Sequence, residues 1–224
     1  LFNSLFTKHA IDAVYVPLML QSENELASLL SVNQKNRLFQ NQLSGFSVTM
    51  PFKECAFRFC KTHQLPQVSA VNTLTRRARG WTSDNTDAGG IAKQLNKIPG
   101  LSKKKVALIG AGGAAQIIAH VLLQRQVHFT IYNRTLSHAR LLAQKTNATA
   151  FPLSKLRKAQ FDVLINSTSL QFQDFDHFLS PNQLKHCQVV EINYRPLETG
   201  LIKLARAHGL LPPLDGLDFF IAQG

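Results

Sequence analysis

The chain has 224 residues, of which 45% are hydrophobic, and its formal net charge at pH 7 is +12. It is long enough to bury the core of one large or two small domains, and it has no apolar run near the roughly 18 residues that a membrane-spanning helix needs. Because the N-terminus also lacks the charged-then-apolar order of a signal peptide, we expect a cytoplasmic protein without a membrane partner.

The positive charge could serve nucleic acid, a membrane surface or small anionic ligands. Basic residues are spread along the chain, and their clusters at residues 75–79 and 102–105 come without a helix-turn-helix, finger or aromatic RNA-binding pattern. We therefore expect no nucleic-acid partner. The cysteines at positions 55, 60 and 187 have no metal-ligand spacing, so we predict reduced, structural thiols and no metal site.

Helical and strand-like segments alternate over the first 89 residues. The patterns predict helices over residues 1–10, 22–39 and 51–63, strands over residues 12–20 and 45–50, and a hairpin of residues 69–77 and 79–85 around Gly80. Ser22 followed by Glu25 is a capping box at the second helix. Lys53 falls in the first turn of the third helix, where the helix dipole is already positive, so it is either solvated or meets a negative or reactive group.

A second unit begins near Gly89 with a helix over residues 91–98 and a break at Pro99-Gly100. Strands separated by helical stretches are then predicted over residues 105–110, 128–133, 148–151, 161–166, 188–193 and 209–214. A last helix is predicted from residue 215 onward. This succession is typical of a doubly wound α/β domain, so the fold class is α/β with two domains.

The sequence between the first two strands of this unit contains the pattern G-x-G-x-x-A at Gly110, Gly112 and Ala115. The first glycine permits a tight turn, the second lets a pyrophosphate approach the backbone, and the small alanine lets the helix pack close to the strand. We predict a dinucleotide site whose turn is formed by residues Gly110, Ala111, Gly112, Gly113 and Ala114.

The second strand ends in Asn133-Arg134-Thr135, where NAD enzymes usually carry an acidic residue that binds the ribose. An arginine can pair with a 2′-phosphate through two hydrogen bonds and stack on the adenine. These three residues therefore favour NADP over NAD. A solvated arginine at the end of a strand is the alternative interpretation.

The chain resembles the shikimate dehydrogenase family in several motifs, which occur in the family's order over essentially the whole length. The motifs are SVTMPFKE (47–54), AVNTL (70–74) with DNTDAGG (84–90), LIGAGGAA (108–115) with NRT (133–135), NYRPLETGL (193–201) and DGLDFFIAQ (215–223). The resemblance implies a substrate-binding domain of residues 1–89, completed by residues 215–224, and a Rossmann-type NADP-binding domain of residues 90–214. It also implies the NADP-dependent reduction of 3-dehydroshikimate to shikimate, in aromatic amino-acid and chorismate biosynthesis.

By the same resemblance, Lys53 is the catalytic lysine and Asp87 is its partner. An ammonium group near a developing alkoxide stabilises the negative charge, and a neighbouring carboxylate orients the ammonium. Without the motifs, both residues would be interpreted as surface charges.

Four more residues match positions that contact the substrate in the family: Thr49, Asn72, Tyr194 and Gln223. For Thr49, Asn72 and Tyr194 a structural interpretation is also open, as a strand residue, a hairpin residue and a packed aromatic. Gly216 fits a glycine at the start of a helix, and a backbone contact with the cofactor is a further prediction.

Several features depart from the family's pattern. The family's N-terminal strand and serine-rich substrate loop are missing, and the chain begins on Leu1 and ends in an apolar run, so we expect a fragment. It could be the dehydrogenase module of a polypeptide fused to a 3-dehydroquinate dehydratase. His138 stands where many NADP-using members carry a second basic residue, and Glu191 replaces the usual aspartate.

Other functions stay open from the sequence. A close variant would act on quinate with NAD, although Arg134 argues against it. A ligand sensor of the shikimate pathway would not need Lys53 and Asp87. Glutamyl-tRNA reductase can share the glycine turn followed by NRT, but it leaves residues 48–53 and 70–74 unexplained. We expect a monomer or a homodimer that binds a small-molecule substrate.

Overall fold

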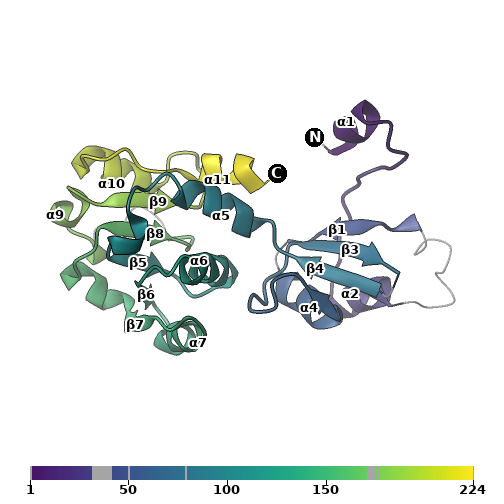
Figure 1. The fold of residues 1–224 in the computed structure, drawn as a ribbon, viewed down its shortest axis with the longest axis horizontal. Coiled ribbons are helices and arrows are strands. Elements are labelled where there is room, and N and C mark those ends of the chain that lie inside the picture. Colours follow the sequence, from purple (N-terminus) through teal and green to yellow (C-terminus); the bar gives the residue numbers. More distant parts are fainter. Residues whose placement is uncertain are drawn as a thin grey trace. The chain divides into compact units, whose positions relative to one another are not determined.

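The structure is a computed structural model that describes residues 2–31, 42–49, 51–78, 80–170, 175 and 177–223 (Figure 1). The chain separates into two compact units, Leu1–Leu43 and Ser44–Gly224. The larger unit contains two β-sheets, one built from residues 45–84 and the other from residues 106–191. The division into domains near residue 89 stays a prediction.

The smaller unit contains helices α1 (Phe2–Lys8) and α2 (Glu23–Leu30). Ser22 caps α2 by accepting a hydrogen bond from the Glu25 amide at 3.3 Å. The Glu25 carboxylate accepts from the amide of Gln21 at 2.7 Å, one residue before the predicted partner. Helix α2 ends at Leu30, and positions 32–39 of the predicted helix lie outside the described residues.

The strand predicted over residues 12–20 is wrong, because these residues form neither strand nor helix. Their apolar side chains are largely exposed, with Val14 at 73% and Met19 at 84%. A strand is stabilised by hydrogen bonds to a neighbouring strand, and none of the described strands pairs with this segment. An apolar run alone was therefore an insufficient signal.

The first sheet has the strand order β1-β3-β4-β2. Its strands are β1 (Gly45–Ser47), β3 (Thr73–Arg77), β4 (Gly80–Asp84) and β2 (Thr62–His63). Strands β3 and β4 form the predicted antiparallel hairpin, and Gly80 has a φ of +121°, a conformation that favours glycine. The predicted helix over residues 51–63 is shorter, because α4 (Lys53–Phe59) ends before β2, which pairs in parallel with β4.

The second sheet is entirely parallel, with the order β7-β6-β5-β8-β9. Its strands are β5 (Val106–Ile109), β6 (Phe129–Asn133), β7 (Thr149–Pro152), β8 (Val163–Asn166) and β9 (Gln188–Glu191). The predicted strands and the doubly wound topology are confirmed. The last predicted strand is reduced to a single bridge between Leu214 and Val190.

Helices cover both faces of this sheet. They are α5 (Asp87–Leu95), α6 (Gly113–Gln124), α7 (Leu136–Thr146), α9 (Pro181–Leu184), α10 (Gly200–His208) and α11 (Gly216–Gln223), with 3₁₀ turns η2 (Leu101–Lys103) and η3 (Leu153–Lys158). Alternate residues of β5 enter different cores: Val106 and Leu108 pack with α5, α6 and α7, whereas Ala107 and Ile109 pack with α10 and η3. Burial on both faces explains why the strands are continuously apolar.

Helix α11 returns to pack against α5. The ring of Phe219 lies so close to Gly90 that a Cβ atom there would approach it to 3.1 Å. None of the helices in the described ranges has the length and apolar character needed to span a membrane. The cysteine thiols are all buried, and burial raises the pKa of Cys187 to about 12, so this thiol stays protonated near neutral pH.

Candidate active site

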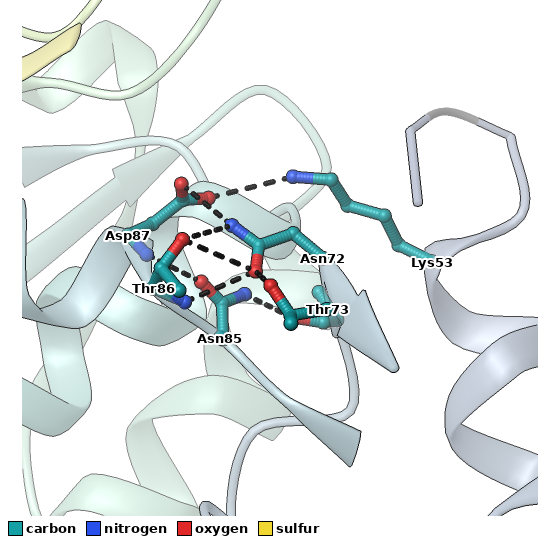
Figure 2. A network of polar contacts seen from close by, with 7 residues as sticks. Lys53, Asn72, Thr73, Asn85, Thr86 and Asp87 are labelled. Atoms are coloured by element: carbon teal, nitrogen blue, oxygen red, sulfur yellow. Dashed lines mark hydrogen bonds and ion pairs between the residues drawn. The ribbon is translucent and has the colours of Figure 1, made fainter. Parts of the chain in front are cut away.

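Lys53 and Asp87 meet in the structure, as the motifs predict (Figure 2). Lys53 is the first residue of α4 and Asp87 is the first residue of α5. The Lys53 Nζ lies 3.4 Å from the Asp87 Oδ2, and their side chains are 27% and 14% exposed. The pair is therefore accessible to a ligand and partly shielded from water.

Asn72 holds the other oxygen of the Asp87 carboxylate. Its Nδ2 donates to Asp87 Oδ1 at 2.9 Å (Figure 2). Its Oδ1 accepts from the Thr86 amide at 3.0 Å and from the Thr73 hydroxyl at 2.8 Å. These two donors fix the orientation of the amide, because they leave the NH₂ group to face the carboxylate.

Asn85 holds the backbone of Asp87 rather than its carboxylate. It is 3% exposed, its Oδ1 accepts from the Asp87 amide at 2.9 Å, and its Nδ2 donates to the carbonyl of Ala70. A carboxylate in the first turn of α5 is also favoured by the helix dipole. The motif DNTDAGG pointed only to Asp87, and the helix was predicted over residues 91–98. Helix α5 begins four residues earlier, at Asp87, and this earlier start is what places Asn85 two positions before a helix.

The glycine turn between β5 and α6 has the geometry that a dinucleotide needs. Gly110 has a φ of +114°, and a Cβ atom there would collide with the Ser167 hydroxyl. Gly112 precedes α6, and a Cβ atom there would meet nothing within 4 Å, so the space in front of the helix N-terminus is open. Ala115 is fully buried. The turn thus fits a pyrophosphate, which the amides of Gly113 and Ala114 could bind.

The residues predicted to bind the 2′-phosphate lie at the end of β6. Asn133 closes the turn by donating to the carbonyl of Thr135 at 2.9 Å. Arg134 is exposed, and among the described residues it forms no hydrogen bond or ion pair. His138 lines a cavity of about 500 Å³ that also includes Ala111 of the glycine turn and several residues of α6 and α7.

The other predicted contacts are dispersed. Thr49 is exposed, and its carbonyl accepts from the Phe52 amide at 3.0 Å just before α4. Tyr194 is half-buried, with its ring 4.5 Å from that of Phe220 on α11. The last residue of α11 is Gln223, whose side chain lies outside the described part of the structure. No hydrogen bond or ion pair within the described ranges joins these residues to the Lys53 and Asp87 pair.

Gly216 starts α11, as predicted, and its small size has a local reason. A Cβ atom there would collide with the carbonyl oxygen of Asn193. The role of Gly216 in cofactor binding stays a prediction.

A buried carboxylate lies beside the loop that follows β8. Glu191 is 1% exposed and accepts from Asn166 Nδ2 at 3.0 Å, the Asn193 amide at 2.9 Å and the Thr199 hydroxyl at 3.1 Å. Asn166 in turn accepts from the Thr168 amide at 3.0 Å, so the loop is tied to β9. Burial raises the pKa of Glu191, and the hydrogen bonds oppose this effect without cancelling it. The sequence showed only that a glutamate replaces an aspartate.

A parallel sheet with a dinucleotide turn at the carboxyl end of its first strand, together with a lysine and carboxylate pair, defines a nicotinamide-dependent oxidoreductase. A family model described as Shikimate / quinate 5-dehydrogenase matches residues 91–177, and one described as Shikimate dehydrogenase substrate binding domain matches residues 1–74. The shikimate dehydrogenase (NADP(+)) of Syntrophobacter fumaroxidans is 31% identical over 100% of this chain and 78% of its own length. The chain therefore belongs to the shikimate dehydrogenase family.

Solved structures agree with this assignment. The chain matches a shikimate 5-dehydrogenase from Listeria monocytogenes in complex with shikimate and NAD, with a TM-score of 0.82, 26% identity and coverage of 99% of this chain and 82% of that one. It matches the enzyme from Thermus thermophilus in complex with NADP(H) and shikimate with a TM-score of 0.78, 26% identity and coverage of 97% and 81%. The predictions of the family and the fold class are confirmed. Membership of this family excludes the alternative that the chain is a glutamyl-tRNA reductase.

Two alanine substitutions in the glycine turn should have opposite consequences. Gly110→Ala should lower the free energy of unfolding by more than about 1 kcal/mol, because it strains a positive φ and collides with Ser167. Gly112→Ala should change the free energy of unfolding by less than about 1 kcal/mol but weaken dinucleotide binding, because its methyl group occupies the space of the pyrophosphate. Denaturant unfolding and NADPH fluorescence titration measure both; unimpaired binding by Gly112→Ala would contradict this account of the turn.

Glu191 should make the stability of the protein depend on pH. Below the ordinary pKa of glutamate it is protonated in both the folded and the unfolded chain. Between that value and the raised pKa of the folded protein, the folded state retains a proton that the unfolded chain has released, so the free energy of unfolding falls as the pH rises. Relative to Glu191→Gln, the unaltered protein should therefore lose stability from acidic toward neutral pH in denaturant titrations. Parallel pH curves for the two proteins would rule out the raised pKa.

Proposed function

We propose that this protein is an NADP-dependent shikimate dehydrogenase, which interconverts 3-dehydroshikimate and shikimate by hydride transfer at a ring carbon. The observation that carries the proposal is the contact of Lys53 with Asp87 in a chain of this family that also has the dinucleotide turn. A sensor that only bound pathway ligands would have no use for a proton donor held by a carboxylate. The two alternatives left open by the sequence, a quinate enzyme that uses NAD and a ligand sensor, have less support than this function.

The nicotinamide of NADP(H) would supply or accept the hydride when bound. The residues of this chain would manage the proton. As hydride reaches the ketone carbon, negative charge develops on the oxygen, and the Lys53 ammonium stabilises this charge and donates a proton. In the oxidation of shikimate, neutral Lys53 takes the proton back from the hydroxyl group.

Asp87 would assist proton transfer by holding Lys53 in position. One oxygen of its carboxylate accepts a hydrogen bond from Asn72, and the other faces the Lys53 ammonium. The position of Lys53 is therefore restrained before a substrate arrives. A group already held in place loses less entropy on reaching the transition state. We propose that Thr49, Tyr194 and Gln223 add contacts to the substrate's hydroxyl and carboxylate groups, as in the motif match, and that Asn72 combines such a contact with holding Asp87.

Arg134 would determine the choice of cofactor. The exposed guanidinium at the end of β6 offers two parallel donors to a 2′-phosphate, and no carboxylate replaces it at that position. Asn133 shapes the turn, and Thr135 would add a hydrogen bond. His138, which replaces the second basic residue of many NADP-using members, would make the grip on the 2′-phosphate weaker than in those members. A cytoplasmic location, a fused dehydratase and a monomeric or homodimeric state stay predictions.

Replacement of Lys53 tests the chemistry. Lys53→Ala should lower kcat for shikimate oxidation by about a hundredfold or more, because it removes the proton-transfer group. The affinity for NADPH should be nearly unchanged. Lys97→Ala is the matched control, since it removes a lysine that forms an exposed ion pair with Asp218. The measurement is initial rates from nicotinamide absorbance with shikimate, quinate or no substrate; equal losses of turnover and NADPH affinity would indicate a structural lysine.

Replacement of Arg134 tests the cofactor preference. Arg134→Asp should lower kcat/KM for NADP by at least about tenfold relative to NAD, because a carboxylate repels the 2′-phosphate and can bind the ribose hydroxyl. Lys203→Asp, on the exposed side of α10, makes the same change in charge and should leave the ratio as it is. An unchanged ratio in Arg134→Asp would remove the role assigned to this arginine.

A further inference from the structure

Gln116, in the first turns of α6, contacts a loop that leads into strand β3. Its Oε1 accepts two hydrogen bonds from one residue: from the Ser69 hydroxyl at 2.9 Å and from the Ser69 amide at 3.3 Å. The Gln116 amide donates to the carbonyl of Gly112 at 3.0 Å. One residue therefore joins the dinucleotide turn, through its backbone, to residue 69, through its side chain.

Apolar packing brings the same two segments as close as their atoms allow. Val68 and Ala70 pack with Ile117 of α6 in a small buried cluster. A Cβ atom added to Gly113 would lie 2.8 Å from the Cβ of Ala70, so only a glycine fits there without a shift. This close packing holds the loop at one position on α6.

The loop connects its contact on α6 to Lys53 and Asp87, because each residue from 69 to 72 forms a hydrogen bond to a different part of the site. Ser69 binds Gln116, and the Ala70 carbonyl accepts from Asn85, which holds the Asp87 amide. The Val71 amide donates to the carbonyl of Lys53 at 3.3 Å. Asn72 donates to the Asp87 carboxylate at 2.9 Å.

We propose that Gln116 and Ser69 are positioning residues that set the distance between the dinucleotide turn and the Lys53 and Asp87 pair. The proposal rests on the proposed function. Gln116 forms no described contact with either charged residue and acts through the loop. A shift of the loop along α6 would move the proton donor relative to the cofactor, and small displacements of reacting groups slow a reaction strongly.

Gln116→Leu tests this role, since leucine has a similar size but no acceptor for Ser69. We expect kcat for shikimate oxidation to fall about tenfold, with the NADPH affinity and the midpoint of thermal unfolding close to those of the unaltered protein. The deuterium isotope effect from labelled shikimate should rise, because hydride transfer becomes more rate-limiting. Gln124→Leu, an exposed position at the end of the same helix, should change none of these quantities.

The partner substitution gives a second measurement. Ser69→Ala removes the hydroxyl donor but keeps the amide donor, so it should lower kcat less than Gln116→Leu does. The double variant should lose no more than Gln116→Leu alone, because that substitution already removes both hydrogen bonds. Ser69→Thr retains the hydroxyl donor and should restore turnover. Additive losses, or equal losses of NADPH affinity and turnover, would overturn the proposal.

Hydrogen exchange separates this proposal from the proposed function. In Gln116→Leu the amides of Val71 and Asn72 should exchange faster, whereas amides of the distant strand β7 should not. If the unaltered full-length protein does not oxidise shikimate, the proposed function fails, and the exchange of these two amides still decides whether Gln116 orders the loop. Unchanged exchange together with unchanged kcat would overturn the positioning role.

Discussion

The half-buried carboxylate of Asp87 is the constraint around which the first sheet and its loops are organised. A charged group with so little exposure is destabilising unless hydrogen-bond donors and a positive charge surround it. Here the donors come from Asn72 and from the N-terminus of α5, and the charge comes from Lys53. The three sources belong to different segments, so the carboxylate is satisfied only when the hairpin, α4 and α5 have all formed.

The second sheet has a different role, because it positions the backbone amides of the glycine turn where an anion can bind. Continuously apolar strands bury both faces of the sheet and place the glycine turn at the carboxyl end of β5. The rigidity of this core makes the N-terminus of α6 a fixed reference point. The loop of residues 69–72 then relates the reacting pair to that point, since it touches α6 at one end and Asp87 at the other. Under the proposed function, these four consecutive residues would link proton transfer to cofactor binding.

Features that depend on local patterns could be predicted from the sequence. Strands β5 to β9, the hairpin around Gly80 and the glycine turn follow from periodicity and from the conformational freedom of glycine. The meeting of Lys53 with Asp87 came from motif resemblance, because no local rule relates two residues so far apart. The missing strand at residues 12–20 and the short strand β2 depend on which segments lie alongside, and this information is tertiary. The contact of Ser69 with Gln116 and the setting of Glu191 are side-chain arrangements that only the folded chain defines.

The hairpin of β3 and β4 carries Asn72 before its first strand and leads into Asp87 after its second. Thr73 pairs with Asp84 and Arg77 pairs with Gly80, so the register fixes how far apart the two ends of the hairpin emerge. A register slip by one residue would turn the side chains of one strand to the opposite face. Such a slip, unlike a longer loop at the tip of the hairpin, would also move the Asn72 amide away from the Asp87 carboxylate. The pairing of β3 with β4 thus keeps together an amide and a carboxylate that are 15 residues apart in the sequence.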